Sequence, residues 1–306
     1  MNTTRLLIGF TGLLLVGALL SCEDHRSQVV TPGANRLRVK RIEQGSQPGA
    51  ARFVFTVTDF AYDAQNRLSS TTTYRPDSVA FPFERTLYQY DTQNRLTRVE
   101  HSEIRGGSRT ETYFLTYNPA GQLAQVANLP SGISVAFQYN AANQLTGYTK
   151  ALNVPGFRST GGAGTLTFTG SNLTTELAEF SVFREGESPS APPVYSWGGK
   201  MTYTYDVNGI NPFYGVFVIP EPGQFFSPPG TSNFGPVGTL YGGIDNLFNV
   251  SPRNVATAFV STGFGPPYRE IYYNHTYNAV GLPTHRGIAT FPFKIAQFVD
   301  YEYESY

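Results

Sequence analysis

The sequence predicts an all-β protein, an antiparallel meander of β-hairpins that form one curved sheet, either open or partly rolled up. Three observations predict this fold. A motif that starts with Tyr-Asp or Tyr-Asn recurs along the chain, aromatic and polar residues alternate before its copies, and turn-forming residues are abundant, with 31 Gly and 21 Pro among 306 residues. Alternation with a period of two is typical of a strand with one buried face.

The repeated motif reads Tyr-Asp-x-x-Asn-Arg-Leu in its first two copies and becomes looser along the chain. Clear copies begin at Tyr62, Tyr90, Tyr117 and Tyr139, looser copies begin at Tyr205 and Tyr277, and a shortened copy begins at Phe168. The spacing of the early copies suits two strands with their connection. We therefore expect each copy to be the turn of one hairpin.

Turn chemistry explains the motif. Asp63 and Asp91 follow their tyrosines, and such a residue caps the backbone of a type I turn. Three residues further on stands a residue type that tolerates a positive φ: Asn66, Asn94, Gly121 and Asn143, with Gly209 and Gly281 in the looser copies. A type I turn followed by a left-handed residue is a common hairpin connection with a β-bulge.

The strands beside these turns present a face that must be buried. Segments such as Tyr88-Gln89-Tyr90 alternate aromatic and polar residues, and leucines such as Leu68 and Leu96 open the return strands. One hairpin is not stable alone, so the hairpins must lie side by side. We expect one β domain over residues 36–306.

The motif resembles the YD repeat of the RHS and toxin-shell proteins. That resemblance implies a spiralling β-sheet, which encloses a chamber in the long arrays of those proteins. This chain has too few copies for us to expect an enclosed chamber. The pattern of residues 36–306 is also similar to a family of Gram-negative, Bacteroidetes-type lipoproteins of unknown function, which implies a fold and a location but no functional site.

The first residues predict a lipoprotein. Residues 1–21 form an apolar signal peptide with Arg5 as its only charge, and Leu19-Leu20-Ser21-Cys22 resembles a lipobox. Cys22, the only cysteine of the chain, is the predicted site of lipidation; an ordinary signal peptide is the alternative. Residues 22–35 then form a tether. We expect a lipid-anchored protein of the bacterial outer membrane, on the periplasmic face or at the cell surface.

Charge and cysteine content exclude several classes of protein. Lys and Arg total 22 and so do Asp and Glu, so the chain has no net field to attract nucleic acid, and we expect no nucleic-acid partner. With Cys22 acylated, neither a disulfide nor a thiolate metal site remains. We expect no metal and no cofactor.

A Pro- and Gly-rich excursion interrupts the pattern at about residues 219–252. Its apolar content argues against disorder, and long excursions of this kind are uncommon without a function. The excursion is expected to be either a lid over one end of the sheet or a binding loop. If it binds a ligand, the candidate residues are the exposed aromatic rings Trp197, Phe225, Phe226, Phe234 and Tyr241.

No catalytic motif is present. His101, His275 and His285 are scattered, and as isolated strand histidines they are expected to face solvent. Nothing distinguishes the acids Glu176, Glu179, Glu270 and Glu302, and the glycine run at 161–164 predicts a loop because a strand-like segment follows it. We expect a non-catalytic binding or structural module for a glycan or protein ligand. The alternative is a glycan-degrading hydrolase, which a buried group of carboxylates in a cleft would favour.

Overall fold

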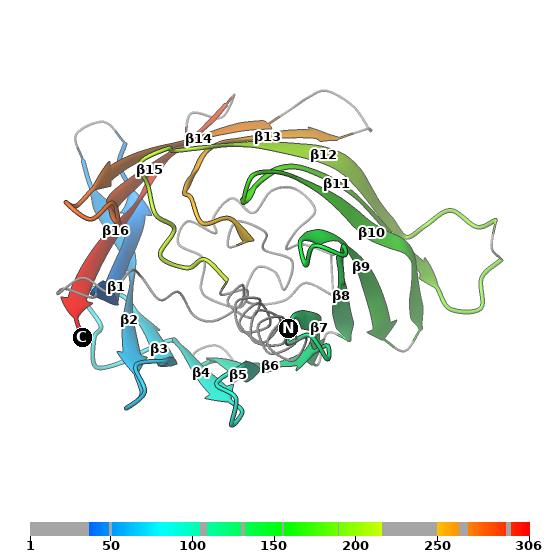
Figure 1. Ribbon diagram of the computed structural model, residues 1–306, viewed down its shortest axis with the longest axis horizontal. Coiled ribbons are helices and arrows are strands. Elements are labelled where there is room, and N and C mark those ends of the chain that lie inside the picture. Colours follow the sequence, from blue (N-terminus) through cyan, green and yellow to red (C-terminus); the bar gives the residue numbers. More distant parts are fainter. Residues whose placement is uncertain are drawn as a thin grey trace, which may run out of the picture.

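Antiparallel strands wind around one closed barrel in the computed structural model (Figure 1). The structure describes residues 37–48, 51–104, 109–129, 132–154, 156–188, 190–215, 250–262, 269–291 and 295–306. In this part of the chain each of the sixteen strands pairs with the strands before and after it in sequence, and β1 pairs with β16.

The strands are mostly seven to thirteen residues long, which fits strands joined by short turns. They are β1 (Leu37–Ser46), β2 (Phe53–Tyr62), β3 (Leu68–Tyr74), β4 (Glu84–Tyr90), β5 (Leu96–Glu103), β6 (Arg109–Tyr117), β7 (Leu123–Leu129), β8 (Ile133–Tyr139), β9 (Leu145–Val154), β10 (Phe157–Thr169), β11 (Asn172–Arg184), β12 (Tyr195–Tyr205), β13 (Val255–Thr262), β14 (Arg269–Tyr277), β15 (Pro283–Phe291) and β16 (Ile295–Ser305). The described residues include no helix of the length and apolarity needed to cross a membrane.

The turns of the clear motif copies share one geometry. In the first copy the Asp63 carboxylate accepts hydrogen bonds from the backbone N–H groups of Gln65 and Arg67, both at 2.9 Å, and from the Arg67 guanidinium at 2.7 Å. Asn66 closes the turn with a φ of 63°. Burial opposes ionisation of Asp63, but the bonds from Arg67 outweigh it, so the pKa of Asp63 lies below its ordinary value.

The same geometry recurs in the other copies. Asn94 and Asn143 have φ values of 64° and 62°, and Gly121 and Gly281 have values of 82° and 83°. The strand register shifts by one residue at the tyrosine of each clear copy, so each hairpin carries a β-bulge. The predicted meander of antiparallel hairpins is confirmed.

Each turn is also bonded to its neighbour. The Tyr90 hydroxyl donates to the Leu68 carbonyl of the preceding repeat at 2.9 Å, and the Arg67 guanidinium lies 4.5 Å from the Tyr90 ring centre. Tyr117 repeats the pattern with Leu96 and Arg95. Burial raises the pKa of Tyr117 to about 12, although Arg95 opposes the rise, so its hydroxyl keeps the proton that it donates.

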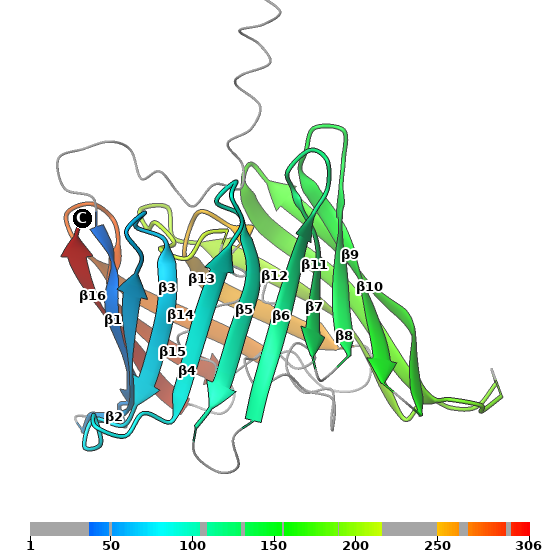
Figure 2. The same cartoon turned by 90° about the horizontal axis from the view of Figure 1, so that it is seen from below.

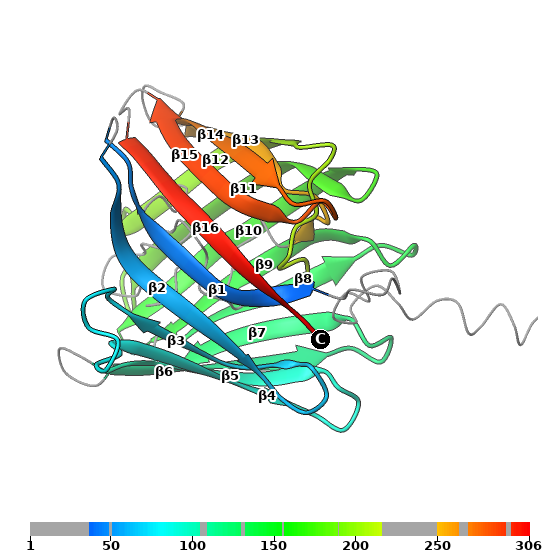
Figure 3. The ribbon, with the colours of Figure 1, turned by 90° about the vertical axis from the view of Figure 1, so that its left-hand side faces the viewer.

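The two ends of the chain close the barrel by forming a further copy of this motif (Figure 3). Glu304 accepts from the Arg38 guanidinium at 2.7 Å, as Asp63 accepts from Arg67, and the Arg38 guanidinium lies 4.0 Å from the Tyr62 ring centre. The Tyr303 hydroxyl donates to the carbonyl of Pro283 at 2.8 Å.

The expectation of an open or partly rolled-up sheet with too few repeats to enclose a space was therefore wrong. Strand twist accumulates across a sheet, and sixteen strands suffice for a wide closed barrel. Closure also removes the two exposed sheet edges that an open sheet would leave.

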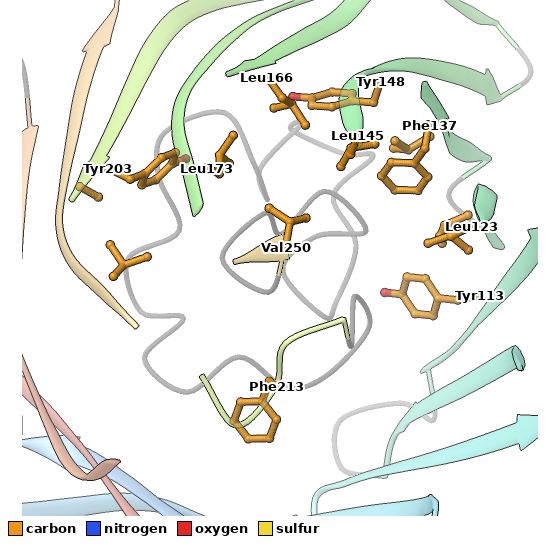
Figure 4. Close-up of a cluster of buried hydrophobic side chains, with 14 of the residues drawn as sticks. Tyr113, Leu123, Phe137, Leu145, Tyr148, Leu166, Leu173, Tyr203, Phe213 and Val250 are labelled. Atoms are coloured by element: carbon orange, nitrogen blue, oxygen red, sulfur yellow. The ribbon is translucent and has the colours of Figure 1, made fainter. Parts of the chain in front are cut away.

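The hydrophobic core lies inside the barrel. Successive strand residues point alternately inward and outward. In Figure 4 the rings of Tyr113, Phe137 and Tyr203, all buried, project from the wall toward the interior. Phe213, before the excursion, and Val250, near its end, lie inside this ring of side chains. Phe213 stacks on Phe60 of β2 at 5.9 Å between ring centres.

The motif copy at Tyr205 does not form a tight hairpin, unlike the others. The N–H of Asp206 donates to the carbonyl of Asn254 at 2.9 Å, and the N–H of Asn211 donates to that of Pro252 at 2.9 Å. The chain thus leaves and re-enters the wall at one place. Gly209 is buried without a positive φ, and it leaves room for the Tyr277 ring, which would overlap a Cβ atom there.

Two smaller expectations were also wrong. The glycine run at 161–164 belongs to β10 rather than to a loop, and Gly164 leaves the space that the Tyr148 ring fills. His101 does not face solvent: it is 2% exposed, 3.0 Å from the Thr86 hydroxyl, and burial lowers its pKa to about 3. The inward side of each strand therefore buries polar as well as apolar residues.

Gly121 tests the turn geometry. We expect Gly121→Val to destabilise the protein by about 1 kcal/mol or more, because a β-branched residue resists a positive φ, and Gly121→Asn to be nearly silent. A Cβ at this position meets no atom within 4 Å, so a loss would come from the backbone and not from a clash. Urea unfolding midpoints measure both variants, and equal midpoints would contradict the left-handed assignment.

Candidate functional site at the barrel rim

The predicted ligand-binding aromatic residues are not placed by the structure. Phe225, Phe226, Phe234 and Tyr241 lie outside the described residues, as does Cys22. Trp197 lies on β12 opposite Phe180, and its side chain is also outside the described part. A binding role for the excursion and lipidation of Cys22 therefore stay predictions.

The ends of the excursion are bonded into the barrel core. The Ser251 hydroxyl accepts from the N–H of Leu173 at 2.9 Å and donates to the Tyr205 hydroxyl at 2.8 Å. The Asn211 side chain donates to the Ser251 carbonyl at 3.1 Å. These bonds fix where the excursion begins and ends, and they give its described ends a structural role.

The four acids singled out as unassigned carboxylates do not form a cluster. Glu176 is 1% exposed inside the barrel, where the hydroxyls of Tyr148 and Tyr203 donate to it. Glu179 and Glu302 are exposed. Glu270 bonds to the Tyr272 hydroxyl on a strand position that alternates with buried Ile271, so it belongs to the outer face.

A pocket of about 710 Å³ lies at the opposite end of the barrel from the motif turns. It is formed by the start of β2, the connection from β3 to β4 and the end of β5 (Figure 2). We call it the rim pocket, and its lining residues are Val54, Phe55, Thr56, Arg75, Pro76, Asp77, Phe83 and Glu103. Pockets of this size hold small ligands in many proteins.

Unpaired charges distinguish the rim pocket. Among the described residues, the lining residues Arg75, Asp77 and Glu103 make no side-chain hydrogen bond and no ion pair. The same is true of Glu84, which lies beside the pocket opposite Glu103. Charges elsewhere on the wall are widely paired, as in Arg41–Asp59, Arg67–Asp63 and Arg98–Glu100. A chain with only 14% charged residues thus leaves several of them without partners at one place.

Two of these carboxylates face each other. Glu84 of β4 lies directly opposite Glu103 of β5 in the strand register. Burial first, and then the negative charge of Glu103, raises the pKa of Glu84 to about 6. At a pH near 6 or below, Glu84 therefore carries a proton that it can donate in a hydrogen bond, which an ionised carboxylate cannot do.

Exposed apolar side chains surround the same end of the barrel. Phe53 is 53% exposed, Phe55 42%, Val79 62% and Phe81 65%. Phe53 and Phe55 come from the start of β2, and Val79 and Phe81 come from the connection between β3 and β4. Exposed apolar groups that gather beside a polar pocket are typical of an interaction site.

Sequence analysis missed this site although the sequence carries a signal for it. The connection 75–83 reads Arg-Pro-Asp-Ser-Val-Ala-Phe-Pro-Phe, the same mixture of proline and phenylalanine that marks the excursion at 219–252. It is longer than a hairpin turn, and longer loops more often carry function. The contribution of Glu103 had no such signal, because only the barrel brings the end of β5 beside this connection.

Comparison with known proteins identifies the repeat. Residues 117–154 match the RHS repeat family, and these residues span the Tyr117 and Tyr139 motif copies. No curated protein is significantly similar to the chain.

Solved structures resemble the chain only distantly. The match to a porin-like protein from Bacteroides vulgatus covers 88% of this chain and 99% of that protein, with 11% identity and a TM-score of 0.43. A porin-like protein from Bacteroides uniformis covers 87% and 96%, with 12% identity and a TM-score of 0.44. TcdB2–TccC3 without its hypervariable C-terminal region covers 82% of this chain and 10% of its own, with 14% identity and a TM-score of 0.30. With every TM-score below 0.5, these likenesses assign no function, and the chain is an all-β protein with an RHS repeat at residues 117–154.

Proposed function

We propose that the protein is a lipid-anchored module of the bacterial outer membrane that binds a neutral glycan at the rim pocket without catalysis. The observation that carries this proposal is the set of unpaired charged groups beside exposed phenylalanine rings. Carboxylates accept hydrogen bonds from sugar hydroxyls, and flat aromatic rings cover the apolar face of a sugar. Because Asp77, Glu84 and Glu103 outnumber Arg75, the pocket disfavours an anionic ligand.

The position of the chain ends supports this arrangement. Leu37, which follows the tether, pairs with Ser305 at the end of the barrel that carries the motif turns. A lipid on Cys22 would therefore hold this end toward the membrane. The rim pocket, at the other end, would face away from the membrane and toward soluble or cell-surface ligands (Figure 2).

The polarity of the outer wall indicates that the barrel is surrounded by water. Its strand positions carry many exposed hydroxyl side chains, and these pair across strands, as in Thr204–Thr257 at 2.7 Å, Thr276–Thr284 at 3.0 Å and Ser102–Thr110 at 3.1 Å. Isolated apolar residues such as Phe114 and Leu177 interrupt this surface. A barrel wall that faces lipid presents an apolar band instead. We infer that the barrel stands in an aqueous compartment on its anchor.

A second function, glycan hydrolysis, is favoured by the facing carboxylates alone. Glycosidases use one protonated and one ionised carboxyl group on either side of the scissile bond, with their pKa values separated by their environments. Glu84, with its raised pKa, would be the acid and Glu103 would be the second carboxyl group. A hydrolase would need such a pair of facing carboxyl groups, whereas a binding module would not.

A glycan array probed with the detergent-solubilised mature protein tests both functions. We expect binding to a neutral glycan that Phe81→Ala and Glu103→Gln weaken at least tenfold, while Phe114→Ala, which removes an exposed ring elsewhere on the wall, leaves it unchanged. Each bound glycan is then incubated with the protein and analysed for cleavage products. Cleavage that Glu84→Gln abolishes would replace binding by hydrolysis, and binding that survives both pocket substitutions would refute the site.

Glu84 gives a pH-dependent prediction that needs no ligand. The folded state raises the pKa of Glu84 from 4.5 to about 6, so its ionisation destabilises the fold as the pH rises through this window. We expect Glu84→Gln to stabilise the protein by about 2 kcal/mol at pH 8 and to have little effect at pH 4, measured by urea unfolding. Glu179→Gln, which removes an exposed carboxylate, is the control. The same gain at both pH values would show that Glu84 is not buried beside Glu103.

The anchor is tested by Cys22→Ala. We expect this variant to leave the membrane fraction or to stall before signal-peptide cleavage, because acyl chains on Cys22 would be its only strong membrane attachment. Fractionation followed by a high-salt wash measures the result. If the variant stays with the membranes after the wash, the lipid anchor is not what holds the protein there.

A further inference from the structure

A second group of unpaired polar atoms lies on the inner wall of the barrel, on strands that do not line the rim pocket. Three buried atoms on the adjacent strands β14, β15 and β16 have no hydrogen-bond partner in the part of the chain that the structure describes: His275 Nδ1, Arg286 Nε and Gln297 Oε1. Arg286 also lacks an ion-pair partner there, and Gln297 is only 8% exposed. Buried polar atoms usually have partners, so three orphans together require an explanation.

The strand register brings the three side chains to one place. His275 lies directly opposite Arg286, and Gln297 lies opposite Ile288, two residues further along β15. Buried Ile271 and Ile288 share this inward face. Directly opposite Cβ atoms are about 5 Å apart and diagonal neighbours about 7–8 Å apart, within reach of long side chains. His275 and Gln297 are both neighbours of Arg286, on the two strands that flank β15, so a ligand held by Arg286 lies within reach of both side chains.

Within the described part of the chain, no carboxylate forms an ion pair with this group. Asp206 acts electrostatically on His275, but its oxygens accept from the Tyr277 hydroxyl at 2.9 Å and from the N–H of Asn208 at 3.1 Å. Burial, and then the charge of Arg286, lowers the pKa of His275 to about 4. Among the residues that the structure describes, the Arg286 guanidinium has the Tyr273 ring, 5.4 Å from its centre, as its favourable contact. A partly buried cation without a counter-charge is costly, and an anion would offset that cost.

We propose that His275, Arg286 and Gln297 bind an oxyanion that also carries a hydroxyl group. The Arg286 guanidinium and an N–H at His275 Nδ1 donate to the anionic oxygens, and the Gln297 carbonyl accepts from the hydroxyl. Hydrogen phosphate and sugar acids have both features. Sulfate at neutral pH has acceptors only, so it leaves Gln297 Oε1 unsatisfied.

Calorimetric titration of the full mature protein in detergent at pH 7 and constant ionic strength tests the site. The probes are inorganic phosphate, glucuronate and sulfate, and the first two distinguish a phosphate site from a sugar-acid site. We expect saturable binding of phosphate or glucuronate, with sulfate at least tenfold weaker. Arg286→Gln should weaken the binding at least tenfold, and Arg85→Gln, which removes an exposed arginine of β4, should not change it.

Two further measurements keep the test decisive. Arg286→Lys retains the charge but loses the forked donor geometry, so it should bind more weakly than the wild type even if Arg286→Gln does not fold. Proton NMR of His275 should show its pKa rise when the anion binds, because a nearby negative charge favours the imidazolium ion. Absence of binding for both phosphate and glucuronate, or unchanged binding in both Arg286 variants, would overturn the site. Sulfate binding as tight as phosphate binding would overturn the role of Gln297.

Discussion

The barrel depends on one contact, the closure of its two chain ends into a copy of the repeated turn. Arg38 and Glu304 reproduce the ion pair that Arg67 and Asp63 make within a single turn, and Tyr303 donates to the preceding repeat as the other motif tyrosines do. The seam thus shares its ion pair and its tyrosine hydrogen bond with the junctions of the first repeats. Without it, β1 and β16 would be exposed edges, and the buried inner face would open to water.

A closed barrel of this width creates a second requirement, a filled interior. The side chains of a sixteen-stranded wall do not meet across its centre. Large residues of the inner face, such as Tyr113 and Phe137, fill part of the interior. Phe213 and Val250, from the chain near the two ends of the excursion, fill more of it. This requirement explains why the motif copy at Tyr205 departs from a tight turn: the place where the wall opens is where the chain contributes to its own core.

Sequence analysis predicted the local structure well, because the turn chemistry is local. The residue types at Asn66 and Gly121 are those that a positive φ favours, and the structure places both there. Closure was not predictable in the same way, since Arg38 and Glu304 belong to opposite ends of the chain and neither is part of a complete motif. Similarly, alternation did not distinguish His101, which is buried, from a solvated strand histidine, because which face of a strand is buried depends on how the sheet closes.

The distribution of charge partners is a guide to function in a protein without a catalytic motif. Most of the wall pairs its charges within a turn or across a strand, so the exceptions stand out. They include Glu84 and Glu103 beside the rim pocket and Arg286, with the unpaired His275 Nδ1, on the inner wall. Burial raises the pKa of Glu84, so its ionisation destabilises the fold, and replacing it by an uncharged residue would be an easy gain in stability. The two proposals place ligands of different charge at these two groups, a neutral glycan at the acidic rim and an oxyanion at the basic inner wall.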